Sequence, residues 1–145
     1  MTAKQFLRQY EEAQRRAFRC KTEYEAELDM IDNVKSTLGG DGMPHGSGIS
    51  RKVEDQAIRL QEKAKKWKKA ELDAIQIRQE VFDVIHDVSG VDGEILYERY
   101  VNLLKWEAVC IVVHLSWFAV HEHHKKALRI VQERIDAKNS IEHTC

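Results

Sequence analysis

Glycine and proline, the residues that interrupt helices most strongly, are concentrated in one short segment of this chain. The single proline, Pro44, lies in GGDGMPHGSG at residues 39–48, which also holds five of the seven glycines. A second, smaller break is SGVDG at residues 89–93. Because a helix cannot continue through such a density of these residues, we expect a loop at residues 39–49 and helical segments around both breaks.

The two long segments next to the first break carry apolar residues at helical spacing. Thr2 and Gln5 form a capping-box pattern that starts a helix. Stripes with steps of three and four are typical of helices that pack seam to seam. We therefore predict a long, coiled-coil-like antiparallel two-helix hairpin over residues 1–88, whose apolar edges favour self-association into a homo-oligomer. The expected seam residues are Phe6, Tyr10, Ala13, Ala17, Cys20, Tyr24, Ile31, Val34 and Leu38, then Val53, Ala57, Leu60, Ala64, Trp67, Ala74, Val81 and Ile85.

A lysine cluster, KAKKWKK at residues 63–69, surrounds Trp67 in the second long segment. One interpretation is a patch that binds phosphates or RNA, with Trp67 as a stacking platform. The other interpretation is that Trp67 belongs to the seam and the lysines form its solvated face. We favour the second, because Glu62, Glu71 and Asp73 dilute the positive charge.

The overall composition excludes several classes of protein. Lys and Arg (23) nearly balance Asp and Glu (24), so the net charge of -1 gives no general attraction to nucleic acid or anionic membranes. Three widely spaced cysteines without a CxxC pair indicate a reducing, cytoplasmic location and no zinc ribbon. No apolar run reaches the length of a membrane-spanning helix. No catalytic or nucleotide-binding motif is present, so we expect no enzyme and no cofactor.

The C-terminal part, residues 92–138, divides into short helices. Asp92 is a plausible N-cap for a first helix that ends near Leu103. A second helix covers residues 106–113, HLS forms a tight turn, and Ser116 caps a third helix. Two helices joined by so short a turn, with the second one longer, have the pattern of a helix-turn-helix domain. The inward residues of the third helix are expected to be Val120, His123, Ala127, Leu128, Val131 and Ile135, and residues 139–145 are expected to form a flexible tail.

The segment at residues 106–128, WEAVCIVVHLSWFAVHEHHKKAL, resembles the end of sigma-factor region four. It resembles more closely the same segment in small phage regulators of the ArpU and RinA type. The shared pattern is Trp106-Glu107, Val109-Cys110, Val113, Ser116, Val120, His124 and Ala127-Leu128. The order of a long helix, a glycine-rich segment and a second long helix is also similar, so the resemblance covers almost the whole chain.

The resemblance implies an all-α transcription regulator that binds DNA inside a host bacterial cell. Ser116 would cap the recognition helix, and Trp106, Val109, Val113, Val120 and Leu128 would join the two motif helices. The groove-facing residues would be Trp117, Phe118, His121, Glu122 and Lys125, and the phosphate contacts would be Lys105, Lys126 and Arg129.

Three departures from the family pattern favour an alternative function to DNA binding. His114 occupies the turn position where the family usually has glycine, so a left-handed backbone there would be strained. Trp117 and Phe118 stand where a DNA reader usually has polar side chains. Residues 92–145 hold seven Lys or Arg against eight Asp or Glu, so the domain is not basic. The alternative is a module that docks on RNA polymerase or another phage protein, or a structural or packaging-associated phage protein.

An apolar surface at Ile111, Val112, Trp117 and Phe118 fits that alternative. It would be exposed as a protein interface, or the long helices would fold back and cover it; the sequence does not separate these two. In HEHH at residues 121–124, His121 and His124 are three apart on a helix and could share a metal, but no HExxH motif is present. We expect ordinary packed or surface histidines and no bound metal.

Overall fold

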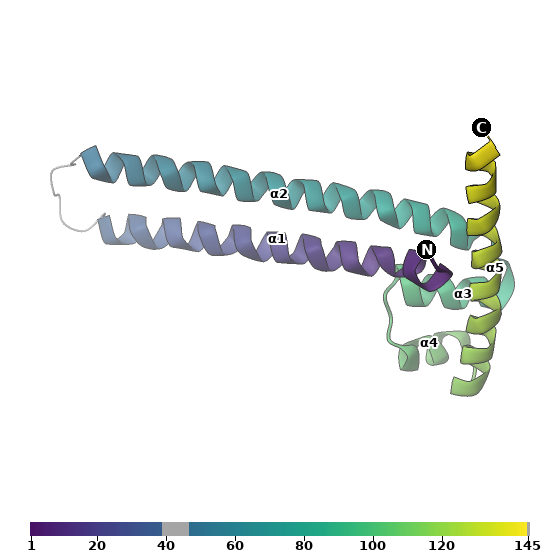
Figure 1. Ribbon diagram of the computed structural model, residues 1–145. Helices are drawn as coiled ribbons and strands as arrows, with labels where there is room; N and C mark the ends of the chain where they lie inside the picture. The colour runs from purple at the N-terminus through teal and green to yellow at the C-terminus, as the bar shows by residue number, and fades with distance from the viewer. Residues whose placement is uncertain (39–46, 145) are drawn as a thin grey trace. The chain divides into compact units, whose positions relative to one another are not determined.

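The computed structural model describes residues 1–38 and 47–144, with the side chains of residues 1–33 and 51–143. This part of the chain is all-helical and contains no strand, so the predicted all-α class is confirmed. Its elements are α1 (Ala3–Leu38), α2 (Ser47–His86), α3 (Gly90–Leu96), a π-helical turn η1 (Tyr97–Val101), α4 (Trp106–Val113) and α5 (Trp117–Thr144) (Figure 1).

The chain contacts divide the fold into two units. The first, called the core unit below, combines Met1–Glu12 with Ile75–Cys145. The second, called the long-helix unit, is Ala13–Ala74. The boundary therefore crosses both long helices, whereas the sequence suggested a division near residues 88–92.

The predicted ends of the long helices agree with the structure within a few residues, which is the usual uncertainty of helix ends. The capping box is present: the Thr2 N–H donates to Gln5 Oε1 at 2.9 Å, and the Gln5 N–H donates to Thr2 Oγ1 at 3.2 Å. Of the loop expected at residues 39–49, residues 39–46 lie outside the described residues. Residues 47–49 are already part of α2.

In the long-helix unit, α1 and α2 lie side by side (Figure 1). The rings of Tyr24 and Trp67 are 5.3 Å apart, and Lys63 Nζ lies 3.5 Å from Glu23 Oε2. The buried side chains described in this unit are all small: Ala13, Ala17, Ala70 and Ala74. The seam prediction is wrong at Val53, which is 49% exposed, and at Ala57, which is also exposed. The reason is that a contact between two helices covers only one side of each helix, so that the flank of a seam stays in water.

The core unit buries larger side chains, because three helices converge on them. Ile95, Val109 and Val120 are fully buried and form one cluster from α3, α4 and α5. The partly buried residues around this cluster are Leu104, Trp106, Cys110, Val113 and Leu115. Of the residues expected to join α4 and α5, Val109 and Val120 belong to the cluster and Trp106 and Val113 pack against it, while Leu128 is half-buried and not part of it.

The predicted role of Asp92 as an N-cap is wrong. The residue before α3 is Ser89, and Asp92 lies within the first turn of that helix. Its carboxylate Oδ1 is 2.7 Å from Nδ1 of His123 on α5, so a tertiary contact takes the place of a helix cap. Asp92 therefore ties α3 to α5.

The C-terminal helix is longer than the sequence indicated. α5 continues to Thr144, so residues 139–144, expected to be a tail, are helical. Cys145 lies outside the described residues.

Candidate nucleic-acid interface

The turn between α4 and α5 follows the local sequence closely. α4 ends at Val113, and His114 adopts the left-handed conformation with φ 56° and ψ 42°. The Leu115 N–H donates to the Cys110 carbonyl oxygen at 3.2 Å, which closes the end of α4. The family pattern usually has glycine at this position, and a left-handed backbone at a non-glycine residue is strained.

Ser116 caps α5 as predicted. Its Oγ accepts a hydrogen bond from the Ala119 N–H at 3.2 Å, and its carbonyl accepts one from the Val120 N–H at 2.9 Å. These bonds satisfy donors that a helix start otherwise leaves unpaired. The first turn of α5 is thereby fixed relative to the turn before it.

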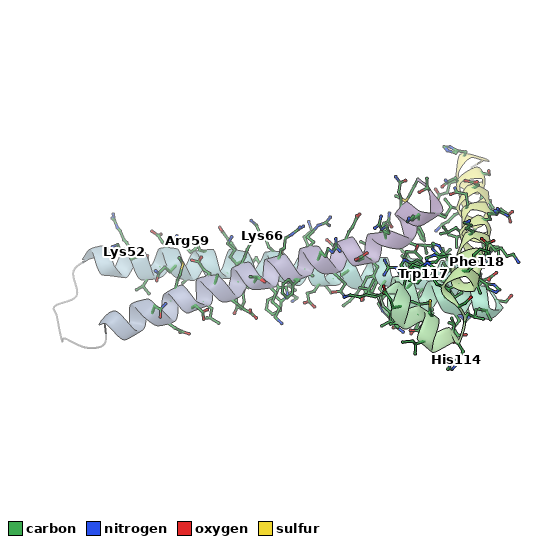
Figure 2. The ribbon with its side chains drawn as sticks, turned by 90° about the horizontal axis from the view of Figure 1, so that it is seen from below. Lys52, Arg59, Lys66, His114, Trp117 and Phe118 are labelled. Atoms are coloured by element: carbon green, nitrogen blue, oxygen red, sulfur yellow. The ribbon has the colours of Figure 1, made fainter. Side chains whose placement is uncertain are left out.

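The apolar surface around this turn is exposed. The exposed fraction is 53% for Trp117 and 75% for Phe118 on α5, and 73% for Ile111 on α4. Val112 is 41% exposed. Figure 2 labels Trp117 and Phe118 at the start of α5 and His114 in the turn.

A row of aromatic rings runs inward from Trp117. The ring centroids are 4.5 Å apart for Trp117 and His121, and 4.7 Å for His121 and Trp106. The guanidinium of Arg99 lies 5.0 Å from the centre of the Trp106 ring and donates to the Leu104 carbonyl at 2.8 Å. His121 is thus half-buried between two indoles, on the flank of α5 and not on its outer face. Its Nε2 is buried and has no hydrogen-bond partner within the described residues.

His124 is the histidine that the core buries, with an exposed fraction of 7%. Its Nε2 is 2.8 Å from the hydroxyl of Tyr100. Burial lowers the pKa of His124 to about 4, helped by repulsion from His121, Lys4 and Arg99. Burial also raises the pKa of Tyr100. Both groups are therefore neutral at neutral pH.

The sequence analysis placed His123 on the inward side of α5, and this prediction is wrong because the buried histidine is His124. His123 keeps a side-chain exposure of 37% and contacts Asp92, whereas His124 lies under Tyr100. The spacing carried a signal for this, because His124 follows the buried Val120 by four residues and so shares its side of the helix. No sequence signal identified Tyr100 as its partner.

The charged residues expected to meet DNA lie on the surface. Glu122 and Lys125 are exposed and form an ion pair at 3.4 Å. Lys126 and Arg129 follow on the same helix and are exposed. Lys105 is exposed and immediately precedes α4. All the predicted site residues except His121 are therefore accessible.

The lysine cluster on α2 has the character of a solvated face. The Trp67 indole N–H donates to Glu71 Oε1 at 2.8 Å, and its ring packs against Tyr24, so it offers no free stacking platform. Lys52, Arg59 and Lys66 are exposed at intervals of seven residues and extend from the same side of α2 (Figure 2).

Neither a metal-binding cluster nor a membrane-spanning helix is found in the described residues. No group of three or more His, Cys, Asp or Glu side chains there is placed to hold a metal ion. None of the helices described is both long enough and apolar enough to cross a membrane.

Comparison of the whole chain with protein-family models, with curated proteins and with solved structures gives no match.

Proposed function

We propose that this protein is a phage-encoded transcription regulator of the ArpU and RinA type that binds duplex DNA through a helix-turn-helix formed by α4 and α5. The observation that carries the proposal is the junction of the two helices. A left-handed residue at His114 and a serine cap at Ser116 join a short helix to a longer one whose outer face is exposed. In helix-turn-helix proteins, the N-terminal residues of the second helix contact base edges.

The proposed architecture is a long antiparallel hairpin followed by this domain. The contact of Tyr24 with Trp67 and the ion pair of Glu23 with Lys63 support the pairing of α1 with α2. Exposed apolar residues on the long-helix unit, such as Phe18 at 69% and Leu72 at 57%, favour self-association of these helices. A dimer would present two recognition helices to two half-sites.

The test of DNA binding is a titration of the full chain with mixed-sequence duplex DNA at two salt concentrations. If Lys105, Lys126 and Arg129 each neutralise one phosphate, a fourfold rise in salt weakens binding about 40-fold. Replacing either Lys126 or Arg129 by Ala reduces the slope of log affinity against log salt by roughly one. Lys138→Ala is the matched control, since Lys138 is also exposed on α5 but lies beyond the proposed interface.

A second candidate function is protein docking, because Ile111, Trp117 and Phe118 form an exposed apolar surface. The partner would be RNA polymerase or another phage protein. Trp117→Ala separates the two functions. Under the DNA proposal it lowers DNA affinity and leaves the melting temperature nearly unchanged, since Trp117 is half-exposed. An absence of DNA binding at low salt would reject the DNA proposal and leave protein docking.

A further inference from the structure

The outer face of α5 carries a specific order of side chains. Phe118, Glu122, Lys125 and Arg129 follow one another in steps of four, three and four, which places them on one side of the helix. This side is opposite to the buried Val120, because Phe118 and Glu122 are each turned about 160° from it. All four residues are exposed. Read from the N-terminus, the face is apolar, then acidic, then basic.

The first two turns of α5 lack the side chains that most often recognise bases. Residues 117–124, WFAVHEHH, contain no Arg, Lys, Asn or Gln. Bidentate recognition of guanine by Arg or Lys, and of adenine by Asn or Gln, is therefore unavailable there. Two contacts of the major-groove code remain open to Phe118 and Glu122. An apolar side chain contacts the 5-methyl group of thymine, and a carboxylate accepts from the N4 amino group of cytosine.

We propose that the start of α5 recognises a thymine through its 5-methyl group at Phe118 and a neighbouring cytosine through its N4 amino group at Glu122. This inference rests on the proposed DNA-binding function and specifies the sequence class that the site reads. Phe118 is 75% exposed and carries no polar group, so its contact with a methyl group removes apolar surface from water without leaving a donor or acceptor unpaired.

Lys125 supports the role assigned to Glu122. In the free protein its Nζ lies 3.4 Å from Glu122 Oε1, with side-chain exposures of 67% for Lys125 and 49% for Glu122. Such an exposed pair is weak. The negative potential of the groove of bound DNA attracts Lys125 away from the pair, and Glu122 then accepts from the cytosine amino group. Glu122 also repels an acceptor-only base edge at the same position, which adds to specificity.

The experiment starts from a selection of bound sequences out of a random duplex pool, with the full chain as bait. The enriched duplex is then resynthesised with deoxyuridine in place of each thymine in turn, which removes one methyl group and changes no hydrogen bond. At the thymine that contacts Phe118, we expect affinity to fall roughly fourfold, the value of one methyl group transferred from water. Cytosine at that position weakens binding further, and 5-methylcytosine, which restores the methyl group, recovers part of the loss.

Variants of Phe118 and Glu122 test whether these two residues cause the preferences for thymine and cytosine. Phe118→Ala reduces the affinity ratio of thymine to deoxyuridine duplexes to about one, while Ile141→Ala leaves it unchanged. Ile141 is a matched control because it is 68% exposed on the same helix, far from the turn. Glu122→Gln relaxes the preference for cytosine at the neighbouring position and leaves the thymine preference intact.

Each outcome separates this inference from the function on which it rests. Salt-dependent DNA binding with no response to the methyl group, or an enriched site without thymine, rejects the methyl reading and leaves the DNA-binding proposal standing. No enrichment and no duplex binding at low salt reject both and favour the protein-docking function. A methyl effect that survives Phe118→Ala shows that another residue reads the thymine and overturns the assignment.

Discussion

The core unit and the long-helix unit use apolar residues in opposite ways. In the core unit, Ile95, Val109 and Val120 are completely buried where α3, α4 and α5 meet. In the long-helix unit, the buried side chains described are alanines, and large residues remain exposed, such as Phe18 at 69% and Ile58 at 54%. The difference follows from the number of neighbours, since one partner helix cannot surround a large side chain, whereas several can.

This comparison separates two sources of stability. The core unit contains the contacts that exclude water, so its free energy of unfolding is expected to depend on single large side chains. The long-helix unit depends on a narrow seam of small residues and on exposed ion pairs, each worth little. Its exposed apolar residues are available for a second copy of the chain, in line with the proposed self-association.

Two isoleucines give the sharpest test of this contrast. Ile95→Ala in the core unit is expected to cost about 2–5 kcal/mol, because it leaves a cavity in the cluster. Ile58→Ala in the long-helix unit is expected to cost less than about 0.5 kcal/mol, because the side chain is largely in water. Urea unfolding of both variants at low protein concentration measures the difference. Equal losses would break the comparison and mean that Ile58 is buried in solution by another copy.

The buried histidine gives the core unit a pH dependence. Burial lowers the pKa of His124 to about 4 in the fold, from its ordinary value of 6.5. Because the folded pKa is depressed, the fold favours neutral His124. The unfolded state binds the proton first, so stability is lost as pH falls from 6.5 towards 4. The free energy of unfolding is expected to drop by about 2 kcal/mol between pH 7.5 and pH 5.

Urea unfolding at the two pH values measures this loss. His124→Gln removes most of the pH dependence, whereas His114→Gln, at an exposed position in the turn, retains it. An unchanged pH dependence in His124→Gln would contradict the assignment of the titrating group.

Two serines test whether the start of α5 depends on its cap. Ser116→Ala removes the hydrogen bond from Ser116 Oγ to the Ala119 N–H and is expected to cost about 1 kcal/mol. Ser89 precedes α3 without a side-chain capping bond, so Ser89→Ala is expected to leave the melting temperature nearly unchanged. Thermal unfolding followed by circular dichroism compares them, and equal effects would remove the special role of Ser116.

The smallest expected effect belongs to the ion pair between the long helices. Lys63 Nζ and Glu23 Oε2 are 3.5 Å apart, and their side chains are 32% and 55% exposed. Lys63→Ala is expected to cost about 0.2–0.5 kcal/mol, since an exposed pair gains little over its solvated state. A loss above about 1 kcal/mol in urea unfolding would mean that the seam relies on this pair more than its exposure suggests.

Much of the candidate interface could be predicted because its signals are local. The bounds of α4 and the cap at Ser116 each depend on a few neighbouring residues. The capping box of Thr2 and Gln5 is of the same kind. Such features are encoded by backbone preferences and short hydrogen bonds, so they can be read from sequence without knowledge of the packing.

By itself, the sequence determined the helical class, the ends of the long helices to within a few residues and the start of α5. The break expected at residues 89–93 was misplaced, because α3 already begins at Gly90. Only the tertiary structure decided which side chains those helices bury. His123 and His124 both lie near the inward side of α5. Which of the two is buried depends on their partners Asp92 and Tyr100, which come from elsewhere in the chain. Asp92 was likewise expected from its neighbours to cap a helix, but its carboxylate contacts His123 on α5 instead. Helical periodicity fixes the direction of a side chain, but burial requires a second element to cover it, and sequence spacing does not specify that element.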